Sequence, residues 1–124
     1  MATILLVDDD TALRGMLHEM LTLLGHDVVQ VSDGAQALKA FRAKPTEVVI
    51  MDLIMPEMEG LETIRELKRS GAKTKILAIS GGGRSDPRDL LVIAMQFGAH
   101  GVLAKPFSIA ELTAALKALL PENA

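Results

Sequence analysis

Hydrophobic and polar residues alternate along this chain in two patterns that predict two kinds of element. Short apolar runs at residues 4–7, 28–31, 48–51, 76–79 and 101–104 have the length and composition of β-strands. The first, third and fourth runs are almost continuously hydrophobic, which is typical of strands in a parallel sheet covered on both faces. Between the runs, apolar residues recur every three or four positions, which indicates amphipathic helices.

The helical pattern is clearest directly after the first run. One apolar stripe there is formed by Leu13, Met16, Leu17, Met20, Leu21 and Leu24. Gly25 follows the stripe and is expected to end this helix. Shorter stripes predict further helices around residues 37–41, 61–67, 90–97 and 109–120.

The ends of the last two helices carry their own signals. Gly98 is the expected stop of the fourth helix, and Pro121 that of the fifth. Ser108 and Glu111 have the spacing of a capping box at the start of the fifth helix. The alternation therefore predicts a (βα)₅ chain that forms a doubly wound, open, parallel five-stranded sheet with helices on both faces.

Composition narrows the class of protein. The 124 residues correspond to one domain, and 49% hydrophobic with 23% charged residues is an ordinary globular balance. The chain has no cysteine, which excludes disulfides and thiolate metal sites. It contains neither a secretory signal pattern nor an apolar run of about 20 residues, so we expect a cytoplasmic protein without a membrane contact. The net charge of −3 and the lack of a concentrated basic stripe argue against nucleic-acid binding.

Polar residues follow four of the five predicted strands. Residues 8–10 are all aspartates after the first run, Asp52 follows the third, Ser80 the fourth and Lys105 the fifth. In a sheet of strand order 2-1-3-4-5 these positions meet at one edge, where open α/β sheets bind ligands. Neighbouring carboxylates repel each other unless a cation lies among them, and oxygen ligands favour Mg²⁺ or Mn²⁺.

Each of these residues has a simpler explanation when it is considered alone. The aspartates could cap the first helix, as we expect of Asp10, and Asp52 could belong to a loop before Pro56. Ser80 could be a turn residue and Lys105 an exposed charge. Their joint occurrence at four matched strand ends favours the functional interpretation.

The motifs that contain these residues resemble those of a known family. They cover residues 5–10, 51–60, 79–81 and 104–107, and the pair Asp-x-x-Met-Pro-x-Met-x-Gly and Lys-Pro-Phe is specific. The whole chain resembles the receiver domain of two-component response regulators, and in extent a stand-alone chemotaxis receiver. The resemblance implies a flavodoxin-like three-layer sandwich, and residues 1–124 are expected to form a single receiver domain without an output domain.

The resemblance also implies a role for each acid. Asp52 matches the phosphoacceptor and one ligand of Mg²⁺. Asp9 matches the direct metal ligand, and Asp8 the acid that binds the metal through water. The main-chain carbonyl of Ile54 matches a further metal ligand.

Other positions match the residues that respond to phosphorylation. Ser80 matches the hydroxyl that contacts the phosphoryl group, Lys105 the lysine that pairs with one of its oxygens, and Pro106 a proline after a cis peptide bond. Val102 stands where many members have an aromatic switch residue, so we expect Ser80 and the following loop to carry the conformational change. That loop, residues 81–87, is longer than expected and contains three glycines.

Three functions are compatible with these residues. The first is a receiver that is phosphorylated by a sensor histidine kinase or phosphotransfer protein and acts, as a monomer or weak homodimer, on an unknown downstream protein. The second is a small Mg²⁺-dependent phosphohydrolase with an aspartyl nucleophile, although Ile54 stands where such enzymes place a second acid. The third is a binding module that is never phosphorylated. We expect the first, with no turnover of a free substrate.

Overall fold

The computed structural model of the protein describes residues 2–53, 57–80 and 87–120. The strands are β1 (Thr3–Val7), β2 (Asp27–Val31), β3 (Val48–Asp52), β4 (Lys75–Ser80) and β5 (Gly101–Ala104). The helices are α1 (Thr11–Leu23), α2 (Gly34–Ala43), α3 (Glu57–Arg69), α4 (Pro87–Phe97) and α5 (Ile109–Leu119). The predicted alternation of strand and helix is confirmed.

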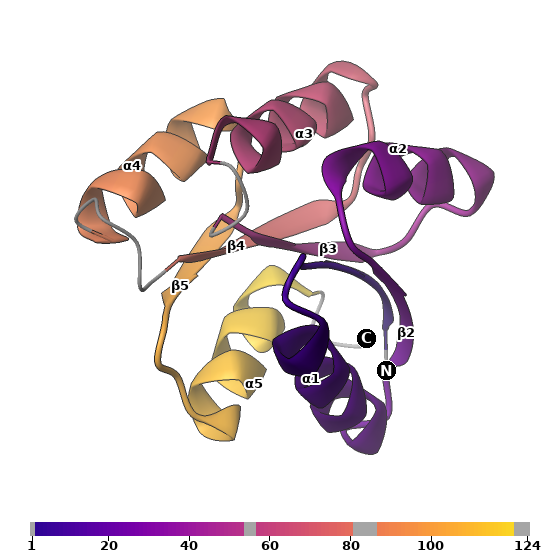
Figure 1. Cartoon of the computed structure of the whole chain (residues 1–124), viewed down its shortest axis with the longest axis vertical. Coiled ribbons are helices and arrows are strands. Elements are labelled where there is room, and N and C mark those ends of the chain that lie inside the picture. Colours follow the sequence, from indigo (N-terminus) through magenta and orange to yellow (C-terminus); the bar gives the residue numbers. More distant parts are fainter. Residues whose placement is uncertain (1, 54–56, 81–86, 121–124) are drawn as a thin grey trace.

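The strands form one parallel sheet in the order β2-β1-β3-β4-β5, as predicted. Helices α2, α3 and α4 cover one face of the sheet, and α1 and α5 cover the other (Figure 1). The strand order switches at β1, because β2 lies on one side of β1 and β3 on the other. In open α/β sheets, ligands usually bind at such a switch point, outside the carboxyl ends of the strands.

Successive side chains along a strand pack alternately into two separate hydrophobic cores, one on each face of the sheet. In β1, Leu5 and Val7 pack with the core under α2, α3 and α4. Ile4 and Leu6 pack with the core under α1 and α5. Because every residue of β3 is buried, its run contains no polar side chain before Asp52. The continuous hydrophobicity of these strands thus follows from coverage on both faces.

Helix ends lie where their capping residues predict. The Asp10 carboxylate caps α1 by accepting the Leu13 N–H, and Ser108 and Glu111 form the complete capping box of α5. Gly25 and Gly98 have φ angles of +94° and +125°, which favour glycine after a helix. Pro121, the predicted stop of α5, lies outside the described residues.

The apolar stripe of α1 is wider than the face that this helix buries. Leu17 and Leu21 are fully buried, but Met16 is 53% and Leu24 40% exposed. The sheet covers only the central part of the stripe, so hydrophobic periodicity located the helix correctly without giving the limits of its buried face. No helix within the described ranges combines the length and hydrophobicity needed to cross a bilayer.

Candidate functional site

Strand register brings three buried polar residues together at the carboxyl-end rim of the sheet. Asp8 directly follows β1, Asp52 is the last residue of β3 and Ser80 the last of β4. Val7 is level with Met51, and Asp52 is level with Ile79, so the chain ends of these strands are adjacent. Asp8, Asp52 and Ser80 are only 1%, 2% and 1% exposed. Fully buried acids need charge compensation, which marks this rim as a candidate site.

Lys105, the residue directly after β5, supplies part of that compensation. Its Nζ donates to Asp52 Oδ2 at 3.0 Å, and both side chains are largely buried. Its main-chain N–H donates to the Ser80 carbonyl at 2.7 Å, which extends the β4–β5 pairing by one residue. The following peptide bond, Lys105–Pro106, is cis, as the family resemblance implied. The ammonium group is therefore held against the Asp52 carboxylate.

The carboxyl group of Asp8 is held close to Asp52 without full compensation. Its Oδ1 accepts the Asp10 N–H at 2.9 Å, while Oδ2 is buried and has no hydrogen-bond partner. The pKa of Asp8 is raised to about 7, mainly by burial and also by the nearby Asp52 carboxylate, although the Asp10 N–H and Lys105 act in the opposite direction. One ammonium thus serves two buried acids.

Arg14 on α1 contributes to this arrangement and was missed by the sequence reasoning. Its Nη1 donates to the main-chain carbonyl of Asp8 at 2.8 Å, and its Nε donates to Gln30 Oε1 on β2 at 3.1 Å. These bonds fix the segment that carries Asp8 between α1 and β2. The sequence does place an arginine in the first turn of the helix that Asp10 caps. The spacing of residues, however, does not show toward which main-chain group its side chain points.

The orphaned oxygens are consistent with a bound cation and a bound anion. Asp8 Oδ2 and Ser80 Oγ are buried and unpartnered, which is unusual unless a ligand completes the site. Mg²⁺ commonly binds one or two carboxylates and takes its remaining ligands from water and phosphate oxygens. The pair Asp8 and Asp52 fits this pattern.

The remaining predicted site residues are placed differently. Asp9 is exposed after β1, and no group of three acidic or histidine side chains in the described ranges stands close enough to hold a metal ion. Its role as a metal ligand stays a prediction. Ile54 and residues 81–86 lie outside the described residues. Val102 on β5 is half-buried beside Ala78 and packs against the core under α2, α3 and α4.

A hydrogen bond between α2 and α3 fixes the start of α3 beside the site. Glu59 Oε1 accepts the main-chain N–H of Gly34 at 2.8 Å, which joins α3 to the first turn of α2. A side chain at Gly34 would collide with the Thr63 hydroxyl, so only glycine allows the two helices this close approach. Both neighbours of the β3 carboxyl end are therefore anchored: Asp8 by Arg14 and α3 by α2.

Comparison with known proteins gives one consistent result. The family model described as "Response regulator receiver domain" matches residues 4–117. Response regulator MprA of Mycolicibacterium vanbaalenii is 36% identical over 117 residues, covering 94% of this chain and 49% of the relative. MprA of Mycobacterium tuberculosis strain CDC 1551 is 35% identical over 125 residues, covering 98% and 53%. The chain spans about half the length of these curated relatives.

Solved structures agree with the same family. A putative response regulator from Chloroflexus aurantiacus superposes with a TM-score of 0.85 at 26% identity, covering 95% of this chain and 96% of that one. The receiver domain of NtrX from Brucella abortus gives a TM-score of 0.84 at 27% identity, covering 94% and 97%. Each of these comparisons extends over nearly the entire chain.

Proposed function

Because the chain belongs to the family of response regulator receiver domains, we propose that Asp52 is the residue that accepts the phosphoryl group. Receivers of this family act in two-component signal transduction. The observation that carries the assignment is the Asp52 carboxylate, which is buried, ion-paired to Lys105 at 3.0 Å and adjacent to an Asp8 oxygen without a partner. Of the acids at this rim, Asp52 has the ammonium closest to it.

The reaction is an exchange of one bond for another. An Oδ atom of Asp52 forms the new O–P bond while the P–N bond of a phosphohistidine donor breaks, and the donor imidazole leaves with the bonding electron pair. Attack of a carboxylate on an anionic donor is opposed by repulsion, so catalysis here depends on positioning and charge. Lys105, already at the carboxylate, neutralises one phosphoryl oxygen as a compact cation.

The acid pair is the proposed site for Mg²⁺. Asp8 and Asp52 would hold the ion, with Asp9 and the Ile54 carbonyl as the further predicted ligands. When bound, Mg²⁺ neutralises charge shared between the carboxylates and the phosphoryl oxygens. The pKa of Asp8, raised mainly by burial, and its unpartnered oxygen support this assignment, since a buried carboxylate is charged more easily beside a cation.

The switch is proposed to begin at Ser80 and Lys105. Phosphorylation adds about −1.5 to −2 charge and three strong acceptor oxygens at Asp52. The buried Ser80 hydroxyl has no other partner and would donate to one of them. Because Ser80 is the last residue of β4 and pairs with Ala104 beside Lys105, a shift at either residue is transmitted to the start of α4 and to β5.

The partners follow from this chemistry. The donor is a sensor histidine kinase or a phosphotransfer protein, and the output is a change in contacts with a downstream protein. The chain is proposed to take up and lose its own phosphoryl group without turning over a free substrate. That the chain acts without an output domain stays a prediction, and so does its oligomeric state, a monomer or weak homodimer.

Replacement of the acceptor tests the proposal. The Asp52→Asn variant, incubated with phosphoramidate and Mg²⁺, should show no phosphoryl mass increase in intact-protein mass spectrometry. Asp10→Asn is the matched control, because asparagine still caps α1 and the residue is exposed. Full labelling of Asp52→Asn would refute the assignment, whereas loss of labelling in both variants would point to a damaged fold. Steady release of phosphate from simple phosphate esters would instead favour a hydrolase.

A further inference from the structure

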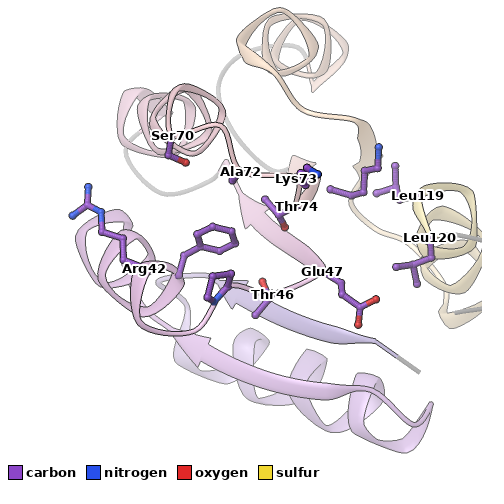
Figure 2. Close-up of a pocket in the computed structure, with 12 residues that line it drawn as sticks. Arg42, Thr46, Glu47, Ser70, Ala72, Lys73, Thr74, Leu119 and Leu120 are labelled. Atoms are coloured by element: carbon purple, nitrogen blue, oxygen red, sulfur yellow. The ribbon is translucent and has the colours of Figure 1, made fainter.

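A hollow of about 560 Å³ lies at the opposite, amino-end rim of the sheet, away from the site described above. Its walls come from the end of α2, the segments that lead into β3 and β4, and the end of α5 (Figure 2). The volume is within the range of small-molecule sites, about 300–1,000 Å³. All residues that line it belong to the described part of the chain.

The lining combines apolar surface with cationic groups. Phe41, Ala72, Leu119 and Leu120 contribute aromatic and aliphatic surface. Figure 2 shows that they come from separate elements: the leucines from α5 and Ala72 from the segment before β4. A binding site for an organic molecule needs apolar surface of this kind together with a few polar groups that fix orientation.

The charges of the lining are unequal and unpaired. Arg42, Lys73 and Lys75 line the hollow together with one acid, Glu47, which gives the lining a net charge of +2 (3 − 1) on a chain whose net charge is −3. In the described residues none of the three cations forms an ion pair with a carboxylate. Glu47 Oε1 instead accepts the Thr3 N–H at 3.2 Å. The cations are thus available to an external anion, and the local field favours one.

An orphaned hydroxyl is the second, independent observation. Three buried side-chain oxygens in the described residues lack a hydrogen-bond partner: Asp8 Oδ2, Ser80 Oγ and Thr74 Oγ1. The first two belong to the carboxyl-end rim, where the proposed Mg²⁺ and phosphoryl group would be their partners. Thr74 is 5% exposed and lines the hollow, within the ring of lining residues seen in Figure 2. Buried unpartnered groups are rare, and each requires an explanation.

We infer that this hollow binds a small organic anion with an apolar body, such as an aromatic or aliphatic carboxylate or sulfonate. The apolar surface takes the body of the molecule, Lys73 and Lys75 take its charged group, and a polar atom of the ligand reaches the Thr74 hydroxyl. The inference is independent of phosphorylation, because the two rims share no residue.

Fluorescence titration of the full chain with anilinonaphthalene sulfonate tests this inference. Neutral phenylnaphthylamine has the same ring system without the sulfonate and is the matched ligand. The double variant Lys73→Gln/Lys75→Gln should weaken sulfonate binding about tenfold and leave binding of the neutral compound unchanged. Lys39→Gln/Lys117→Gln, at exposed lysines outside the hollow, is the matched protein control and should bind like the wild type.

The location is checked by amide chemical-shift mapping in the same titration. Shifts should concentrate in residues 41–47, 70–75 and 119–120. Shifts on the exposed apolar residues of α4, equal affinity for the neutral compound, or no saturation of the fluorescence would each overturn the inference. Displacement of the probe by a polyglutamate peptide but not by decanoate would also overturn it, in favour of an acidic protein partner.

Discussion

The two rims of the sheet differ in how they satisfy their polar groups. At the amino-end rim, histidine side chains accept strand N–H groups: His26 Nδ1 accepts the Ala2 N–H at 3.1 Å, and His100 Nδ1 accepts the Ile76 N–H at 3.0 Å. At the carboxyl-end rim, buried oxygens of Asp8 and Ser80 remain without partners. The protein thus satisfies these two N–H groups at the amino-end rim and leaves only one buried side-chain oxygen of its described residues there, Thr74 Oγ1, without a partner, whereas two side-chain oxygens of one site lack partners at the carboxyl-end rim.

The titrating groups of the two rims respond to pH in opposite directions. Burial raises the pKa of Asp8 at the carboxyl-end rim. Burial lowers the pKa of His100 at the amino-end rim, and the cations Lys68 and Lys75 lower it further. In both cases the neutral form is the one that fits the folded protein. Negative charge buried at the carboxyl-end rim therefore needs a counter-ion, as the proposed Mg²⁺- and phosphoryl-dependent switch requires.

The largest expected effect on stability comes from removal of the counter-charge at the carboxyl-end rim. Lys105→Met leaves two buried carboxylates without an ammonium and should lower the free energy of unfolding by about 4 kcal/mol at pH 8 without divalent ions. Urea denaturation of the variant and the wild type measures this difference in free energy of unfolding, and added Mg²⁺ should reduce it. The variant should stay folded but uncouple phosphorylation from partner binding.

An exposed ion pair offers the matched control for Lys105. Arg69 and Glu66 approach to 3.5 Å with side chains 68% and 49% exposed. Arg69→Met should therefore cost no more than about 0.5 kcal/mol. Equal losses in the two variants would show that burial does not distinguish the carboxyl-end pair.

The next effect concerns the pH dependence caused by Asp8. Because its folded pKa, about 7, lies above its ordinary value of 3.8, the stability it contributes is complete below pH 3.8 and is lost as pH rises through 7. Asp8→Asn should thus exceed the wild type in free energy of unfolding by about 4 kcal/mol at pH 8, with the difference vanishing near pH 4. Urea denaturation of both proteins between about pH 4 and pH 8 tests the sign of this difference. Added Mg²⁺ should make the difference smaller. A difference that grows as pH falls would show that the folded protein prefers the charged form.

The smallest effect is expected from His100 at the amino-end rim. Its lowered pKa means that its contribution to stability is present above pH 6.5 and lost as pH falls through the folded value. Asparagine can supply an acceptor in place of Nδ1 without titrating. Between about pH 7.5 and 5.5, the free energy of unfolding of His100→Asn should therefore fall less than that of the wild type. NMR titration of the imidazole gives the pKa directly, and a value above 6.5 would be incompatible with this account.

The fold was largely predictable because its signals are local. Strands buried on both faces produce continuous apolar runs, and the capping residues Asp10 and Ser108 fix helix starts by hydrogen bonds within a single turn. The strand boundaries differ from the prediction mainly by one residue, since Asp52 and Ser80 still pair within the sheet. The strand-end rule then located the acids, the hydroxyl and the lysine without knowledge of any contact.

Contacts between distant segments could not be predicted in the same way. The bond from Arg14 to the Asp8 carbonyl and that from Gly34 to Glu59 depend on how helices pack, which spacing in the sequence does not encode. Lys73 and Lys75 form no concentrated basic stripe, so nothing in the sequence indicated a site at these residues. Their position on a hollow beside Thr74 becomes visible only when α2, β4 and α5 are brought together.

The site of labelling tests the central claim most directly. The wild-type chain is incubated with phosphoramidate, with Mg²⁺ or with EDTA, and the phosphorylated residue is identified by peptide mass spectrometry. The account predicts one phosphoryl group on Asp52 that forms with Mg²⁺ and is strongly reduced by EDTA. A phosphoryl group on another residue, or labelling of Asp52 at the same rate in EDTA, would contradict it.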